Sequence, residues 1–380
     1  MTTIQNKPVN PTDHLSAEDI ENLGKDLDAI RQQVLDTRGE RDATHIRRVI
    51  TAQRTLEASS RIVLLFSLFP PAWLAGTTGL SVAKILENME IGHNVLHGQW
   101  DWMRDPKIHS TTWEWDNASP AEQWKHAHNE EQHTYTNVIG KDGDLGYGIM
   151  RVDEEQPWHP FHLGQPLWNL VNAFMFQYGI AAYDLKLGKN LKSKERRNNP
   201  EFRAQVKATV RKVRKQATRD YVVHPLLSGP SAMSTLAANV TANVMRNLWT
   251  HSVIMCGHFP EGVETFAYDS IDGETRGEWY LRQMIGSANI SGSRFMHLMT
   301  GNLSFQIEHH LFPDLPSNRY QVIAPQVRAV FEKYGLTYTS GALVRQVASA
   351  WRKVIRLSLP NGRKISSAGA AERSVAAVAS

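Results

Sequence analysis

Three stretches of the chain contain no Asp, Glu, Lys or Arg, and they stand out against an otherwise polar sequence. They cover residues 62–83, 161–183 and 222–245. A helix needs about 20 apolar residues to cross the core of a bilayer. The three stretches therefore predict apolar helices that embed the chain in a membrane, with Pro70 and Pro71 breaking or kinking the first of them.

The overall composition gives a different picture. Hydrophobic residues make up 41% of the chain and charged residues 21%, and the mean hydropathy is −0.40, which is close to a soluble protein. Each apolar stretch, taken alone, could be a buried helix of a soluble protein. Three such stretches in one chain favour the membrane, and the 11 tryptophans agree because tryptophan is enriched at membrane surfaces.

The polar parts of the chain suggest a division into three. We predict a polar helical segment over residues 1–60, a membrane domain over 61–335, and a C-terminal helix with a tail over 336–380. The tail from residue 361 is small and polar, which is typical of disorder. The N-terminus has no apolar core of a secretory signal, so we expect none to be cleaved.

Residues 184–220 form a basic segment with 13 Lys and Arg against four Asp and Glu. It could bind anionic phospholipid or the phosphates of an acyl-CoA or acyl carrier, dock an acidic electron-transfer partner, or simply be solvated. The positive-inside rule places it on the cytoplasmic side. A single crossing by residues 161–183 would put it opposite the second histidine cluster described below, so we favour a re-entrant or hairpin-like segment there. The net charge of +4 does not indicate nucleic acid.

Histidine is the candidate metal ligand, because the chain has 16 histidines and one cysteine, Cys256. A single cysteine excludes an internal disulfide and a cysteine-based zinc or iron–sulfur site. His93 and His97 have the i,i+4 spacing that chelates one metal from one helix face. Two further clusters follow at residues 126–133 and 306–310.

Neutral imidazoles suit iron, zinc or copper. The candidates exceed what one four-coordinate zinc needs, so two metals are more natural. The adjacent His309 and His310 point about 100° apart on a helix, which lets them reach two metals. Two irons held by nitrogen can activate dioxygen, and that activation is what removing hydrogen from an unactivated carbon requires.

The three clusters with their flanks resemble the histidine boxes of the membrane fatty-acid desaturases. The matching strings are GHNVLHGQWDWM at 92–103, WKHAHNEEQHTYTNVIGKDGDLGYG at 124–148 and GNLSFQIEHHLFPDLPSNRY at 301–320. The similarity extends from about residue 45 to about residue 335 and is greatest to bacterial, especially actinobacterial, acyl desaturases. The resemblance implies an all-α fold of membrane-embedded helices with a cytoplasmic helical cap that holds a di-iron site.

The resemblance also implies a set of metal ligands. Gln132 stands where the family usually has histidine, and we hypothesise that Gln132→His would raise the iron content. His251 matches a ligand that some members carry on the last membrane helix, Asn247 lies one turn before it, and His258 follows in the same apolar stretch. The implied ligands are His93, His97, His128, Gln132, His133, Asn247, His251, Gln306, His309 and His310.

The implied activity is the introduction of a cis double bond into a long acyl chain, with position 9 as the default. O2 is the oxidant, and NAD(P)H supplies electrons through a reductase or ferredoxin-type partner. The substrate is an acyl-CoA or a phospholipid acyl chain, and the site faces the cytoplasm at the plasma membrane. The alternatives are a histidine-box hydroxylase or oxygenase, a metal-poor and catalytically silent lipid-binding relative, and, more distantly, a zinc hydrolase.

Overall fold

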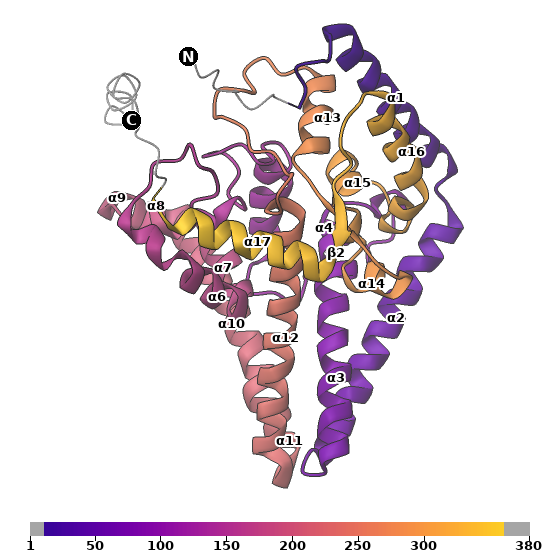
Figure 1. Cartoon of the computed structure of the whole chain (residues 1–380). Coiled ribbons are helices and arrows are strands. Elements are labelled where there is room, and N and C mark those ends of the chain that lie inside the picture. The colour runs from indigo at the N-terminus through magenta and orange to yellow at the C-terminus, as the bar shows by residue number, and fades with distance from the viewer. Residues whose placement is uncertain (1–10, 361–380) are drawn as a thin grey trace.

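The computed structural model describes residues 11–360, and the chain folds mainly into helices (Figure 1). The predicted all-α class is therefore confirmed at the level of a helical fold with a histidine cluster. Two short strands, β1 (Asn289–Ser291) and β2 (Ser340–Ala342), pair in parallel and form the only sheet among these residues. The predicted disordered tail from residue 361 lies outside the described residues.

Two long helical hairpins form the narrow end of the molecule (Figure 1). In the first hairpin, a short turn joins α2 (Glu40–Val63) to α3 (Pro70–Leu86). In the second, α10 (Pro200–Thr218) continues through a π-helical turn into α11 (His224–Leu227), and the chain returns as α12 (Ala232–His258). Helices α3 and α12 pack against each other, so the two hairpins form one unit.

The hairpin turns fall inside the apolar stretches. The predicted break at residues 70–71 is confirmed, because both prolines occupy the first turn of α3, where a proline needs no amide hydrogen. In the second hairpin Gly229, with a φ of +55°, lies in the turn that follows α11. Residues 161–183 divide into α6 (Gln165–Phe174) and α7 (Phe176–Asp184). Within residues 11–360, no helix is both long enough and apolar enough to cross a membrane.

Paired charges are buried where the two hairpins meet. The ammonium group of Lys84 lies 2.8 Å from the carboxylate of Asp220 and 3.1 Å from that of Asp116. Arg61 and Arg219 also bind the carboxylate of Asp220, at 3.0 and 2.8 Å. A buried charge that loses its partner costs several kcal/mol, roughly 3–5. This network therefore fixes the register of α2 and α3 against the second hairpin.

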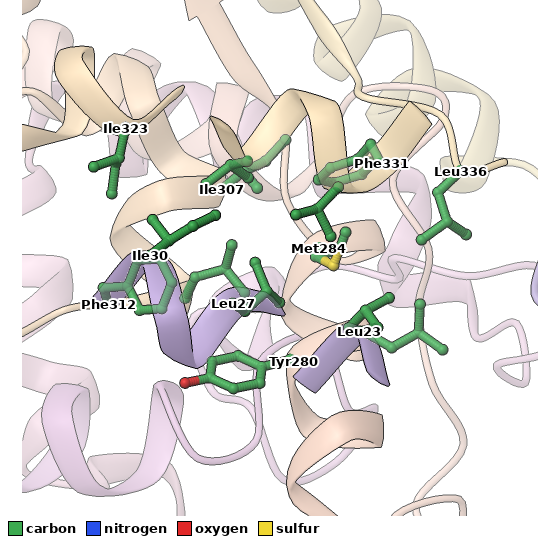
Figure 2. Packing of buried hydrophobic residues seen from close by; sticks show 14 of the residues in the cluster. Leu23, Leu27, Ile30, Tyr280, Met284, Ile307, Phe312, Ile323, Phe331 and Leu336 are labelled. Atoms are coloured by element: carbon green, nitrogen blue, oxygen red, sulfur yellow. The ribbon is translucent and has the colours of Figure 1, made fainter. Parts of the chain in front are cut away.

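The wide end of the molecule is a helical cap around the largest group of buried apolar side chains (Figure 2). Its helices are α1 (Ala17–Thr37), α13 (Arg276–Ile285), α15 (Gln306–Leu311) and α16 (Tyr320–Lys333). Helix α1 contributes Leu23, Leu27 and Ile30 at the spacing of one helix face. The polar segment predicted at residues 1–60 is thus helical in its described part, and it packs one face against the cap.

Short helices connect these parts, and a C-terminal helix lies across the hairpins. They are α4 (Asn94–Leu96), α5 (Ala121–Lys125), α8 (Leu187–Asn190), α9 (Lys194–Asn198), α14 (Arg294–Met299) and α17 (Leu343–Ser358). Helix α17 packs against α6 and α12 (Figure 1). The domain boundaries at residues 60 and 335 stay predictions.

Candidate metal centre

The first histidine box lies where α3 continues into a π-helical turn, Glu87–His93. Such turns are rare, and they occur frequently at functional sites. Gly92 lets this turn pack closely against Trp115. A Cβ atom at position 92 would lie only 2.8 Å from the Cβ atom of Trp115, which is too close for any residue other than glycine. The rings of His93 and His97 end up with their centroids 4.5 Å apart. The predicted pairing of these two side chains is thus present in the geometry.

The second box is also π-helical, over His126–Gln132. The amide of His133 donates a hydrogen bond of 3.0 Å to the carbonyl of His128, five residues earlier. On an α-helix a five-residue spacing would turn the two side chains about 140° apart. The π-helical turn instead brings their ring centroids to 4.9 Å. The local helix type therefore makes this spacing suitable for a common site.

The third box lies on α15, which is buried along its whole length. The rings of His309 and His310 are 5.6 Å apart and nearly perpendicular, at 84°. The ring of His309 lies 4.7 Å from that of His97, whereas the ring of His310 stacks on that of His133 at 4.5 Å. As the sequence predicts, the two neighbours point to different places.

The rings form two adjoining groups. In the first group, the ligand nitrogens all lie within 4.8 Å of one another, and its members are His93, His97, His128 and His309. The second group consists of His133, His258 and His310, with the ring of His258 4.8 Å from that of His310. His133 joins the groups, because its ring lies 4.7 Å from the ring of His97.

Asn247 and His251 lie outside both groups. The Nε2 atom of His251 is 2.9 Å from the side-chain oxygen of Asn169, and its ring packs edge-on against Phe176 at 5.3 Å. The side-chain amide of Asn247 donates to the carbonyl of Phe174 on α6, and its oxygen accepts from Arg246. The structure brings His258 to the centre in their place.

His258 lies on the last turn of α12, seven residues after His251 and on the same helix face. The sequence shows that His251 and His258 share one face of the helix. It does not show which turn of that helix lies beside the other histidine boxes. One feature of the sequence marks His258 as a candidate ligand, namely its position at the end of the last apolar stretch. This feature does not distinguish His258 from His251, which lies in the same stretch.

Two buried glutamines adjoin the second group, because Gln132 precedes His133 in the chain and Gln306 contacts His258. Gln132 is buried, and neither its oxygen nor its nitrogen has a hydrogen-bond partner among the described residues. The side-chain oxygen of Gln306 is also buried and unpartnered, and the Nε2 atom of Gln306 lies 3.3 Å from Nε2 of His258. Buried polar groups are nearly always satisfied, so free amide oxygens beside imidazoles are consistent with ligands to a metal.

The same argument holds for the imidazoles. Among the described residues, the Nε2 atoms of five rings are buried and unpartnered, those of His97, His128, His133, His309 and His310. Five rings are held from outside by their Nδ1 atoms: His93 by Asn94, His128 by Asp144, His258 by Asn137, His309 by Tyr320, and His310 by Thr136 and Gln283. Metal-binding histidines typically have one nitrogen oriented in this way and the other free for the metal. The donor set therefore fits a metal centre.

The electrostatics also suit metal binding. Burial lowers the pKa of His93 to about 3. Burial likewise holds the pKa values of His97, His133, His309 and His310 well below their usual range, with neighbouring rings adding to the effect. All five imidazoles are therefore neutral at pH 7, which is the form that binds a metal.

A buried carboxylate connects the first box to the third. Glu90 accepts hydrogen bonds from the side chains of Asn302 at 2.9 Å and Ser317 at 3.0 Å, both of which flank α15. It also accepts from Asn94 at 3.3 Å, and it lies 2.8 Å from the Nε2 atom of His45. Glu90 thus ties the π-helical turn of the first box to the cap.

Two cavities reach the rings. A small, mainly apolar pocket has His93 and His128 in its wall, together with Trp115, Trp124 and Phe176. An open cleft of about 770 Å³ extends from the surface to His97. A donor set that fits a metal beside an apolar pocket suits oxidation of a hydrocarbon chain.

Comparison with known proteins agrees with this chemistry. Residues 68–342 match the family model described as fatty acid desaturase. The chain belongs to the fatty acid desaturase family. The match includes all three histidine boxes, so the boxes and the fold that gathers them are those of a desaturase, an oxidoreductase.

Two relatives define the place of this desaturase in the family. The NADPH-dependent stearoyl-CoA 9-desaturase of Mycobacterium tuberculosis is 49% identical over 92% of this chain and 82% of its own length. The sn-1 linoleoyl-lipid 6-desaturase of Synechocystis is 25% identical over 73% of this chain and 77% of its own. The similarity to actinobacterial acyl-CoA desaturases predicted from the sequence is thus confirmed.

Proposed function

We propose that this desaturase introduces a cis double bond at carbon 9 of a long-chain acyl-CoA, with O2 as the oxidant. The observation that carries the proposal is the pair of adjoining histidine groups beside an apolar pocket. The name of the mycobacterial relative supports the substrate and the position, because the two proteins are 49% identical over 92% of this chain.

We propose that the centre holds two iron ions. The first group of histidines would hold one iron. His133, His258 and His310 would hold the other, with Gln132 and Gln306 as further oxygen donors, and Asn247 and His251 are not part of this set. When bound, the irons supply the activation of O2 that oxidation of an unactivated carbon requires. The protein fixes the rings through their Nδ1 partners, so the donor atoms need little reorganisation.

The apolar pocket positions the acyl chain. Its aromatic walls exclude water, and His93 and His128 in its wall place a methylene group next to the first histidine group. The pocket is narrow, with a free volume of about 30 Å³. An acyl chain therefore enters only if the lining side chains move. Holding two neighbouring methylenes beside the centre determines which carbon pair is oxidised.

We propose that the narrow end of the molecule enters the plasma membrane, with the metal centre on the cytoplasmic side. Phe66, Leu227 and Met233 at the hairpin turns are 67%, 73% and 76% exposed, and apolar side chains grouped at one end of a protein indicate a lipid contact. Both hairpins return to the side from which they start (Figure 1). Residues 184–199, the first part of the basic segment, then lie on the same side as the histidine boxes, with Lys186 paired to Glu131 of the second box, in agreement with the positive-inside rule. The rest of the segment forms α10 in the second hairpin.

We further propose that NADPH supplies the electrons through a reductase or a ferredoxin-type partner, since the mycobacterial relative is named as NADPH-dependent. The stoichiometry requires a donor. One O2 becomes two waters by taking two hydrogens from the substrate, and two electrons with two protons from the donor.

Turnover of the purified enzyme tests this proposal. Iron-loaded protein receives stearoyl-CoA, NADPH and a compatible reductase, and gas chromatography with mass spectrometry locates the modified carbons. We expect a cis double bond at carbon 9. A hydroxylated product would instead establish the hydroxylase alternative. An enzyme with two irons that leaves stearoyl-CoA unchanged would contradict the proposal.

A further inference from the structure

The cap has a surface opening of its own, away from the two cavities that reach the first histidine group. This cleft of about 380 Å³, here called the cap cleft, is formed by α1, α13 and the chain at the end of α15. No residue that lines it also lines the apolar pocket or the open cleft. A protein can therefore bind at the cap cleft without occupying either of these cavities. Its lining consists of Arg31, Arg276, Trp279, Tyr280, Leu311, Pro313 and Asp314.

The cap cleft leads to His310 by two short routes. Leu311, part of its lining, directly follows His310 in the chain. Trp279 lies one turn before Gln283 on α13, which is a rise of about 6 Å along the helix. The side-chain oxygen of Gln283 is 3.2 Å from Nδ1 of His310. The cap cleft thus approaches a ring of the second group, whereas the apolar pocket and the open cleft reach only rings of the first.

A further line of contacts runs from the cap cleft to His309. The ring of Tyr280 lies 6.0 Å from that of Phe312 in the core of the cap (Figure 2). The carbonyl of Phe312 accepts a hydrogen bond of 3.0 Å from the hydroxyl of Tyr320, and the same hydroxyl is 3.2 Å from Nδ1 of His309. Rings of both histidine groups are therefore connected to this part of the surface.

The surface around the cap cleft is acidic, although the chain as a whole is basic. Helix α1 has six Asp and Glu against two Lys and Arg, and residues 264–278 have five against one. The cations of this surface are already paired, as are two from its neighbourhood. The pairs are Lys25 with Glu21, Arg31 with Asp314, Arg276 with Asp28, Arg282 with Glu274, and Lys333 with Asp26.

An open hollow on the other flank of α13 concentrates this negative charge. The hollow, here called the acidic hollow, has a volume of about 510 Å³, and four carboxylates line it, those of Glu264, Asp272, Glu274 and Glu278. Arg282 is its one cation among the described residues, and it is bound to Glu274. Complementary charge guides two proteins together and fixes their orientation. A partner on this surface therefore needs a basic face.

The position of the cap cleft suits an electron carrier from the cytoplasm. Helices α1 and α13 lie at the wide end of the molecule, opposite the apolar hairpin turns that we propose to enter the membrane (Figure 1). Electron transfer becomes steeply slower with distance, so a carrier must come close to the metal centre. It must also do so while the acyl chain occupies the apolar pocket, which requires a separate place of approach.

We propose that the cap cleft and the acidic hollow together form the docking surface for the electron-transfer partner, which binds through a basic face. The inference rests on the proposed desaturase function, and it adds the place at which electrons enter. In each transfer the partner's reduced flavin or iron–sulfur group loses one electron, which passes to the metal centre. Two transfers deliver the two electrons that one O2 takes from the donor.

Steady-state kinetics test the charge of this surface, with the reductase that supports turnover of stearoyl-CoA as the probe. We expect Asp272→Asn/Glu278→Gln to raise the KM for the reductase by about fivefold or more at low salt, because the acidic hollow loses two charges. The kcat at saturating reductase, the iron content and the Kd for stearoyl-CoA should stay the same. Glu155→Gln/Glu195→Gln, at exposed positions outside the cap, is the matched control and should leave this KM unchanged.

Carbodiimide cross-linking of carboxylates to lysines locates the partner without turnover. We expect peptides of the reductase joined to residues 17–37 or 264–278, and fewer of them in the double variant. Cross-links confined to the basic segment 184–220, or an unchanged KM in the double variant, would overturn the proposal. A change only in self-association, measured by sedimentation, would also overturn it, because the surface would then join two copies of this chain.

A substitution in the cap cleft tests the route to His310. We expect Trp279→Ala to slow the anaerobic reduction of the iron by pre-reduced reductase about tenfold, because the aromatic wall one turn from Gln283 is lost. The absorbance of the iron measures this at saturating reductase with stearoyl-CoA bound. Phe295→Ala, which removes an exposed aromatic ring from α14, should have no effect. An unchanged rate in a folded, iron-loaded Trp279→Ala variant would refute this route.

The docking surface and the proposed function fail in different ways. An enzyme that desaturates stearoyl-CoA, but whose KM and cross-links do not respond to the double variant, refutes the docking surface alone. An enzyme with the expected cross-links that forms no double bond refutes the proposed function alone.

Discussion

The two histidine groups of the metal centre differ in the chemistry of their donors. The first group has four imidazoles whose nitrogens lie within 4.8 Å of one another. The second has three imidazoles, and we assign to it the buried amides of Gln306, which contacts His258, and of Gln132, which precedes His133. An amide oxygen is a harder and weaker donor to iron than an imidazole. Two adjoining positions in one site therefore need not bind metal equally. If each group holds an iron as we propose, the second group should lose its iron first.

The largest effect should follow from a substitution at His309, whose ring lies 4.7 Å from that of His97 and 4.9 Å from that of His133. We expect His309→Ala to lower turnover by more than 100-fold, because a donor that faces both groups is lost. The matched control is Tyr320→Phe, which removes only the hydroxyl 3.2 Å from Nδ1 of His309. Loss of such an outer partner typically costs roughly 10–100-fold in metal affinity or activity. A smaller effect for His309→Ala than for Tyr320→Phe would contradict the assignment.

Gln132→His should remove much of the difference in iron affinity between the two histidine groups. An imidazole in place of the buried amide strengthens the second position, so we expect iron per chain and turnover to rise when iron is limiting. Elemental analysis of the purified proteins measures this. Gln33→His, at an exposed position on α1, controls for the added histidine. Equal iron content in the wild type and Gln132→His would contradict the role given to this glutamine.

The smallest effect concerns His45, a histidine outside both groups. Burial lowers its pKa, but the hydrogen bond and the charge of Glu90 together outweigh burial, so the net pKa is raised. A raised pKa in the folded state adds stability that is fully present below the unfolded value of about 6.5 and is lost as the pH rises through the folded value. We expect His45→Gln to lower the free energy of unfolding by about 1 kcal/mol at pH 5.5 and by less at pH 8.5. Denaturant titrations at both pH values measure it, and an equal loss would contradict a charged His45.

The sequence predicted the helical fold and the three boxes, because spacing and composition are local properties. It predicted the break at residues 70–71 for the same reason, since proline excludes a helix interior. The π-helical turns could not be predicted. They depend on packing, as the close approach of Gly92 to Trp115 shows, and they are what brings His128 and His133 together.

The sequence also could not predict how far the helices are shifted along their axes relative to one another. His251 and His258 share one face of α12, and only the packing of α12 beside α15 brings the second rather than the first to His310. Asp184 reads as one acidic residue before a basic segment, and its place between the apolar pocket and the open cleft follows from contacts distant in the sequence. Such long-range contacts leave no periodic pattern in the chain.

The iron content of two alanine variants on one helix tests the account most directly. We measure iron per chain in His258→Ala and His251→Ala after identical loading. Because His258 lies in the second histidine group and His251 is bound by Asn169, we predict about one iron per chain for His258→Ala and about two for His251→Ala and the wild type. About two irons in His258→Ala with about one in His251→Ala would contradict the second metal position as we describe it.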